Sequence, residues 1–461
     1  MPENTVHNYI KSVLANLPAD WLNLTTHRLD IYNEKNAKFE FLLMLESLFI
    51  GKKVSKEALS ELPTAYDYIR LGHPLSSFLE WSIGKLNEIS PKSIISFSSK
   101  TTPILAVLRR NSLENKATRI YADALPKDFD PDVVRRVYGY EFELLSSEDM
   151  EASKDFQGST VFVIETEKVA HFDLNTKVDF YINTNSDLGS VILINEGNED
   201  YISEIQHVRR RETIAMTPDN CFKALNSIIG NPQDTPETNS LVNKKQVLKT
   251  VQEVNGVNTK ALVGSSGLSI QYAIMMGLIH DAHENHPEKA IKFIVPTNCY
   301  GGTNDQARRV ATCLDHVEII DLLVDGDDDM VQSLDQILDK VAAEDAVPYI
   351  IAEIPTNPRV EVPDLEQLKN VLSQERKTNS GATAIDPVFI LDQTFCPNVH
   401  FLGEGEMLST VRTISYASGS KFPSGGKCTA GYCIGNEKAD ILMEKIEQHL
   451  LLCDNEATPL Q

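Results

Sequence analysis

The sequence lacks an excess of positive charge: 43 Lys and Arg stand against 66 Asp and Glu, which gives a net charge of -23. Nucleic acids and anionic membranes repel such a chain, so neither is expected as its main partner. Residues 1–10 contain no charged start followed by an apolar run, and no apolar stretch has the length of a membrane span. We therefore expect a cytoplasmic protein.

Cysteine is scarce as well. The seven cysteines are odd in number and include no close C-x-x-C pair, which argues against a disulfide framework and a zinc knuckle. His280, His283 and His286 resemble a metal cluster, but their spacing cannot place all three on one helix face. We expect free thiols and no metal.

The length of 461 residues exceeds one ordinary hydrophobic core, and three parts can be distinguished. Residues 1–57 carry apolar side chains at helical spacing, which predicts helices. From Tyr66 onward, short β-branched runs alternate with helical stretches until the polar segment 230–238, which contains prolines. These patterns predict one α/β unit over 58–229 and a second over 230–461.

Both α/β units contain short apolar runs that predict buried strands. The expected strands are 93–97, 119–122, 160–164 and 190–195 in the first unit, and 291–295, 317–323, 349–354, 388–391 and 410–414 in the second. Helices expected over 329–343 and 364–373 fall between strands of the second unit, as a mostly parallel sheet requires. The insertion at 374–384 is expected to be a mobile loop.

One lysine is a candidate for chemistry because a strand leads to it. A largely β-branched run, 411–414, is followed by small residues, Lys421 and the glycine-rich 424–426. Burial at such a strand end can lower the pKa of an amine and free it as a nucleophile. Lys427 is a nearby rival that lacks a preceding strand. We take Lys421 as the candidate nucleophile.

Four stretches before Lys421 could supply a cofactor site. Residues 264–268 open an apolar helix whose N–H groups could hold a phosphate, although this pattern alone fits a plain capped helix better. Tyr300 follows a strand, which predicts a ring at the carboxyl edge of the sheet, or only a turn. Prolines flank Asn357 and aim it as a hydrogen-bond donor. Asp392 ends an apolar strand, where it either needs a charged partner or caps the next turn.

In this order, the segments resemble the cystathionine-metabolism family of pyridoxal-phosphate (PLP) enzymes, which make and break C–S bonds of sulfur amino acids. The resemblance covers 263–435. It implies the PLP-dependent transferase fold, type I aminotransferase-like, an α/β large domain with a mostly parallel sheet. In that fold Lys421 would form the Schiff base, Asp392 would pair with the pyridinium nitrogen, and Tyr300 would stack on the ring.

The resemblance implies further roles at this site. Phosphate contacts would come from Ser266, Gly267, Leu268, Ser418 and Ser420, and Asn357 would touch the ring hydroxyl. A carboxylate keeps the ring nitrogen protonated, so that the ring accepts the carbanion electrons when Lys421 removes the α-proton. Tyr300 would assist departure of the leaving group.

The chain departs from the family pattern at three places. Gln393 replaces the family's asparagine after the aspartate, and Ser420 replaces the usual threonine before the lysine. Only 40 residues follow Lys421 in the 461-residue chain, so the family's small C-terminal domain, with its arginine for the substrate carboxylate, is expected to be absent. Either the chain is truncated or another segment supplies that arginine.

The first α/β unit contains fainter versions of the same motifs. Residues 66–74 resemble the family's Tyr-x-Arg-x-Gly-Asn-Pro motif, and 97–101 stand where the phosphate loop belongs. Residues 178–186 resemble the lysine strand, with Asn185 near the lysine position, and no lysine occurs in 178–206. We interpret this unit as a degenerate copy; an unrelated α/β domain is the alternative.

The family's Tyr-x-Arg pair reaches across a dimer to the neighbouring subunit's phosphate. Here Tyr68 and Arg70 belong to the unit that has no lysine in the matching segment 178–206, so we expect either a homo-oligomer or an internal pseudo-dimer in which they complete the site around Lys421. The predicted function is PLP-dependent elimination or replacement at Cβ or Cγ of a small amino-acid substrate. The alternative is a non-catalytic binding or scaffolding protein that keeps the fold.

Overall fold

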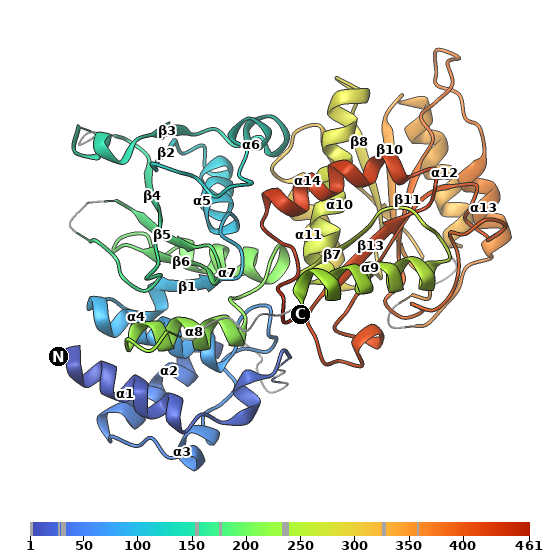
Figure 1. Cartoon of the computed structure of the whole chain (residues 1–461). Coiled ribbons are helices and arrows are strands. Elements are labelled where there is room, and N and C mark those ends of the chain that lie inside the picture. The colour runs from blue at the N-terminus through green and yellow to red at the C-terminus, as the bar shows by residue number, and fades with distance from the viewer. Residues whose placement is uncertain are drawn as a thin grey trace.

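The chain forms two α/β lobes, each built around its own sheet, in the computed structural model (Figure 1). The structure describes residues 3–25, 28, 34–152, 156–174, 178–232, 239–324, 329–356 and 359–461. The first lobe runs from blue to green in Figure 1, and the second runs from yellow-green to red. Within these ranges, no helix combines the length and hydropathy that a membrane crossing needs.

Helices cover one side of the first sheet, as the helical spacing in 1–57 predicts. They are α1 (Glu3–Ala15), α2 (Glu34–Ile50), α3 (Lys56–Ser60), α4 (Pro74–Asn87) and α8 (Pro218–Ile228). Their apolar faces share one core with the sheet, in which Phe41, Phe78 and Trp81 are buried. Short 3-10 helices lie at Ala19–Leu22, Pro91–Ser93, Ser147–Ala152, Phe422–Ser424 and Asp440–Leu442.

The first sheet is mixed and has the order β1-β6-β5-β4-β2-β3. Its strands are β1 (Ile94–Phe97), β2 (Thr118–Tyr121), β3 (Glu143–Leu145), β4 (Ser159–Glu165), β5 (Phe180–Asn185) and β6 (Gly189–Ile194). The helices α5 (Thr102–Leu113), α6 (Pro131–Tyr138) and α7 (Tyr201–Arg211) connect or follow them. Strand β6 is antiparallel to both neighbours, and the other pairings are parallel.

The second sheet has the order β7-β13-β12-β11-β10-β8-β9. Its strands are β7 (Ala261–Gly264), β8 (Ile291–Pro296), β9 (Val317–Leu322), β10 (Val347–Glu353), β11 (Val388–Asp392), β12 (Arg412–Ser418) and β13 (Gly431–Gly435). The helices are α9 (Ser240–Asn255), α10 (Gly267–Asn285), α11 (Gly301–Ala311), α12 (Met330–Ala343), α13 (Leu365–Ser373) and α14 (Met443–Leu452). Strand β13 is the antiparallel member, and the expected mostly parallel sheet is confirmed.

The two sheets share one strand order, apart from one strand. If β7, β8, β9, β10, β12 and β13 are matched with β1 to β6 in sequence, both orders and all strand directions coincide, and only β11 has no counterpart. One backbone hydrogen bond also recurs after the first strand of each sheet. Ser98 N–H donates to Ile214 O at 3.2 Å, and Ser265 N–H donates to Asn455 O at 2.8 Å. The two lobes thus share a strand order and one hydrogen bond next to their first strands.

Most expected strands coincide with observed ones to within a few residues, but two expectations need correction. The lysine strand begins at Arg412 and continues to Ser418, beyond the expected end at 414. The loop 374–384 is fixed rather than loose, since the Arg376 guanidinium bonds to Asp339 at 2.9 Å and also to Asp335 on α12. Of the polar segment 230–238, residues 233–238 lie outside the described residues.

The lobes pack against each other through a shared core. Helix α10 lies between the second sheet and the first lobe, where it contacts α14 and α6. Tyr138 of α6 and Tyr272 of α10 are buried in one continuous cluster with residues from both sheets. This packing brings the turn at 66–72 of the first lobe to the carboxyl edge of the second sheet.

Candidate functional site

A pocket opens at that edge, where strands β10, β11 and β12 end. It encloses about 700 Å³ of empty space, including solvent at its mouth. Ten of the residues expected from the sequence line it: Tyr68, Arg70, Ser266, Gly267, Leu268, Tyr300, Asp392, Ser418, Ser420 and Lys421. Asn357 lies outside the described residues. The pocket therefore joins motifs from both lobes.

One wall of the pocket is the first turn of α10. Ser266 caps this helix, and its side chain accepts a hydrogen bond from Ser269 N–H at 3.0 Å. A Cβ on Gly267 would lie 2.8 Å from the Cβ of Ser418, so only glycine fits against the lysine strand. The N–H groups of the first turn and the positive end of the helix dipole suit an anion such as phosphate.

Hydroxyl groups from two segments meet beside this turn. The Ser420 hydroxyl lies 2.9 Å from that of Ser418 and 2.7 Å from that of Tyr68. Arg70 stacks on the Tyr68 ring at 4.7 Å, and its Nε is buried without a hydrogen-bond partner in the described part of the chain. A buried donor without a partner is costly, so this cluster fits an anionic oxygen acceptor.

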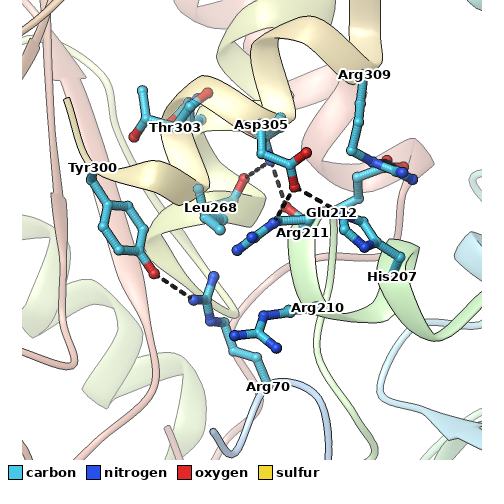
Figure 2. Close-up of polar contacts among 12 residues, drawn as sticks. Arg70, His207, Arg210, Arg211, Glu212, Leu268, Tyr300, Thr303, Asp305 and Arg309 are labelled. Atoms are coloured by element: carbon cyan, nitrogen blue, oxygen red, sulfur yellow. Dashed lines mark hydrogen bonds and ion pairs between the residues drawn. The ribbon is translucent and has the colours of Figure 1, made fainter. Parts of the chain in front are cut away.

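Tyr300 stands at the N-terminus of α11 and lies between the lobes. Its backbone N–H donates to Glu353 Oε1 at 2.6 Å, and its hydroxyl accepts a hydrogen bond from Arg70 at 3.2 Å (Figure 2). Burial alone would raise the pKa of Tyr300. The charge and the hydrogen bond of Arg70, with the charges of Arg211 and Lys421, outweigh burial and lower this pKa. The site therefore favours the phenolate more than an ordinary tyrosine environment does.

Asp392 ends β11 and also caps the turn that follows. Its Oδ1 accepts a hydrogen bond from Thr394 N–H at 2.8 Å, which is the cap on the next turn considered for this residue; its pairing with a charged partner stays a prediction. Burial raises the pKa of Asp392 against the hydrogen bonds of Thr394 and Tyr416, which favour the ionised form. A carboxylate held in this way is stabilised by a cationic N–H partner in the pocket.

Lys421 lies beyond the end of β12, in the loop 419–430. Its ammonium group lies 5.3 Å from the centre of the Tyr68 ring, a cation–π distance. The expectation that this lysine is buried is wrong, because β12 ends at Ser418 and the side chain is exposed. Lys421 therefore stands at the mouth of the pocket, where a small molecule can reach its amine.

These residues fit a PLP group. The turn at Ser266 and the unpartnered Nε of Arg70 suit its phosphate, Asp392 suits a protonated ring nitrogen, and Lys421 offers an amine for its aldehyde. The Tyr300 ring is 40% exposed and lines the same space. None of these residues conflicts with PLP, either in charge or in hydrogen-bonding character.

Seven pocket residues were not expected from the sequence: Gln271, Thr303, Glu353, Thr394, Phe395, Tyr416 and Thr429. Two support expected residues, since the Thr394 hydroxyl accepts a hydrogen bond from Ser418 N–H at 2.9 Å and Glu353 accepts one from Tyr300 N–H at 2.6 Å. Glu353 ends the buried strand β10, and Thr394 follows β11 at the same sheet edge. Their position after neighbouring strands was a usable signal.

The first lobe has different chemistry at the corresponding turns. Strands β5 and β6 are joined by 186–188 alone, whereas 419–430 joins β12 to β13. At the start of α5, the backbone N–H of Lys100 donates to Asp454 Oδ2 at 2.7 Å, and its ammonium group lies 3.5 Å from the same carboxylate. A carboxylate of the second lobe thus covers the turn that corresponds to Ser266.

The three histidines spaced along α10 do not converge. His280 Nδ1 lies 3.1 Å from His449 Nε2, and His283 contacts His316 instead. His286 is the residue at which α10 ends. Among the described residues, no group of three or more His, Cys, Asp or Glu side chains is arranged to bind a metal.

Comparison with known proteins finds many similar solved structures, including the following two. Cystathionine gamma-lyase from yeast matches with a TM-score of 0.36 and 21% identity, over 50% of this chain and 51% of that one. The metB protein from Corynebacterium glutamicum matches with a TM-score of 0.32 and 18% identity, over 46% of this chain and 47% of that one.

The matched region spans about half the length of each of these proteins. No family model matches the chain, and no curated protein matches it.

Proposed function

We propose that the chain is a PLP-dependent enzyme of sulfur amino-acid metabolism that eliminates or replaces a group at Cβ or Cγ of its substrate. The observation that carries this proposal is the single pocket that holds Lys421, Asp392, Tyr300 and the Ser418 and Ser420 hydroxyls. These side chains come from separate motifs, so their convergence supports one shared ligand. A lyase and a synthase use the same groups, and the proposal includes both.

Each residue has a distinct task in this proposal. PLP, when bound, supplies an electron-accepting ring and an aldehyde. Asp392 holds a proton at the ring nitrogen, and the first turn of α10 with Arg70 binds the phosphate. Lys421 moves a proton between substrate carbons from the pocket mouth. Tyr300 covers the ring, and as a phenolate held by Arg70 it can accept a proton from the substrate.

We further propose that the first lobe is a degenerate copy of the second and that the chain is an internal pseudo-dimer. The common strand order supports this proposal, as does the bond from Ser98 to Ile214 that recurs at Ser265. The first lobe lacks a counterpart of β11, the strand that ends in Asp392. It contributes Tyr68 and Arg70 to the pocket of the other lobe.

The test is to supply L-cystathionine to the PLP-loaded protein and to measure release of keto acid and thiol. The proposal predicts turnover that falls by about 1,000-fold or more in Lys421→Ala, because the proton-transferring amine is lost. Lys427→Ala is the matched control, since this exposed lysine does not line the pocket.

Loss of turnover in Lys427→Ala with retention in Lys421→Ala would contradict the assignment of the lysine. A parent protein that binds PLP but turns over neither cystathionine nor an activated homoserine would favour the alternative, a scaffolding protein that keeps the cofactor.

A further inference from the structure

The loop 419–430 turns back on itself directly after Lys421. Residues 421–423 and 425–427 are exposed, so packing does not fix this part of the loop. Gly426 has a positive φ of 77°, which favours glycine, and its N–H donates to the Lys421 carbonyl at 3.0 Å. The position of Gly426 therefore sets the backbone of Lys421.

A segment near the start of the chain reaches this loop. The Thr25 hydroxyl donates to the Gly426 carbonyl at 2.9 Å, and the Thr429 hydroxyl donates to the Leu24 carbonyl at 3.2 Å. The two pairs are separated by 401 and 405 residues along the chain. Because Gly426 also bonds to Lys421, Thr25 is two hydrogen bonds away from the backbone of the lysine.

This segment is anchored to the first lobe on both sides. Trp21 precedes it, is 3% exposed and belongs to the core beneath the first sheet. Arg28 follows it, where the backbone N–H donates to the Asp67 carbonyl at 3.2 Å and the guanidinium donates to the Thr64 carbonyl at 3.3 Å. Residues 24–25 thus lie between two fixed points and can hold the loop against the first lobe.

The loop has a separate contact with the first lobe before the lysine. The Tyr68 hydroxyl lies 2.7 Å from the Ser420 hydroxyl, directly before Lys421. Tyr68 therefore contacts the loop on the strand side of the lysine, and residues 24–25 contact it on the other side. Lys421 lies between these two contacts.

We propose that Leu24 and Thr25 are positioning residues for Lys421, and that they hold the loop 419–430 so that the amine stays at the mouth of the pocket. Neither residue lines the pocket. An amine on an unrestrained loop samples many positions, and ordering it for reaction costs entropy that a held loop has already lost. The chemical part of this inference rests on the proposed function.

The assignment gives the helical N-terminal region, residues 1–57, a task at the site. Residues 24–25 lie between the 3-10 helix Ala19–Leu22 and helix α2. The first lobe then contributes to the site in two ways, because it lines the pocket with Tyr68 and Arg70 and also holds the loop that carries the lysine.

The experiment is limited trypsin digestion of the cofactor-free protein. Trypsin cuts after lysines in loops that open, so cleavage after Lys421 and Lys427 reports release of this loop. Thr25→Val keeps the shape of the side chain and removes its hydroxyl. We expect about 2- to 10-fold faster cleavage at both lysines, because loss of one hydrogen bond raises the open population by this factor. Thr25→Ser keeps the hydroxyl and should restore the parent rate.

Thr312→Val is the matched control. The Thr312 hydroxyl also donates to a backbone carbonyl at an exposed place, that of Arg308 at 2.7 Å, but at the end of α11. Its cleavage rates in the loop should equal those of the parent, and equal thermal unfolding midpoints show that the effect is local. Unchanged cleavage in Thr25→Val, or an equal rise in Thr312→Val, would overturn the proposal.

PLP affinity, measured by absorbance, links the contact to the chemistry. Only the held loop presents Lys421 to the aldehyde, so Thr25→Val should weaken PLP binding by about 2-fold or more, with recovery in Thr25→Ser. Faster cleavage with unchanged PLP affinity would overturn the positioning role. A parent without PLP affinity would overturn the proposed function, and the cleavage rates of the cofactor-free proteins then decide whether residues 24–25 hold the loop.

Discussion

The lowered pKa of Tyr300 depends on a residue of the other lobe. Burial opposes the charged form of a phenol, so an isolated tyrosine at this place would titrate above its ordinary pKa of about 10. Arg70 reverses the direction through its charge and its hydrogen bond of 3.2 Å to the hydroxyl. The contact between the lobes therefore sets the reactivity of one side chain.

This effect gives a prediction about pH. The phenol of Tyr300 should ionise below pH 10. Arg70→Met should raise this pKa, because it removes the positive charge and the hydrogen bond that offset the effect of burial. The measurement is the near-ultraviolet absorbance change between parent and Tyr300→Phe as the pH rises, repeated in the Arg70→Met background. Equal titration in both backgrounds would show that Arg70 does not control this group.

At the residue scale, the expected site residues lie around one pocket, whereas the expected burial of the lysine was wrong. The resemblance to the family's motifs pointed to Tyr68, Asp392 and Ser420, and the structure places them in the lining of that pocket. The exposure of Lys421 was missed, since it depends on how the loop 419–430 leaves the sheet. The Arg211 contact with Asp305 joins distant segments, and no local pattern announces it.

Helix α4 is held to the first sheet by a buried charge cluster. Glu80 is fully buried, and its carboxylate contacts Lys38 Nζ at 2.7 Å, Arg209 Nη1 at 2.9 Å and Ser96 N–H at 2.8 Å. Burial alone would raise the pKa of Glu80, but the two cations outweigh it and lower this pKa. The carboxylate thus links α4, α7, α2 and β1.

Removing the Glu80 carboxylate should lower the free energy of unfolding. Glu80→Ala leaves the buried charges of Lys38 and Arg209 without compensation, and we expect a loss of about 3–5 kcal/mol in the free energy of unfolding. Glu253→Ala serves as the control, because the Glu253 pair with Lys249 is exposed and should contribute at most about 0.5 kcal/mol. Denaturant titration measures both, and equal losses would contradict the account.

The same cluster gives a sign for the pH dependence of stability. A carboxyl whose pKa is lowered by folding stabilises the protein above its unfolded pKa of about 4.3 and loses this contribution as the pH falls through the folded value. The difference between parent and Glu80→Ala should therefore be full at neutral pH and shrink below about pH 4.

At the element scale, most strands of both lobes could be read from short apolar runs. Runs such as Val388 to Leu391 are buried on both faces of the sheet, so every residue in them is apolar. The order of the strands could not be read in this way, because pairing depends on contacts between distant segments. The loop 374–384 was misjudged for a similar reason, since its anchor on α12 is distant in sequence.

The whole molecule combines two similar lobes with unequal chemistry. In the first, residues 186–188 alone join β5 to β6, no strand among the described residues corresponds to β11, and Asp454 covers the turn at Lys100. In the second, the matching features form an open pocket that Tyr68 and Arg70 complete. A chain of this kind should offer one cofactor site, although its architecture resembles two.

The most direct test of this account is a titration of the purified protein with PLP, followed by visible absorption. The account predicts a yellow band that saturates at one PLP per chain in the parent and is lost in Lys421→Ala, because that lysine alone forms the bond. Saturation at two PLP per chain, a band that persists in Lys421→Ala, or a parent that stays colourless would contradict it.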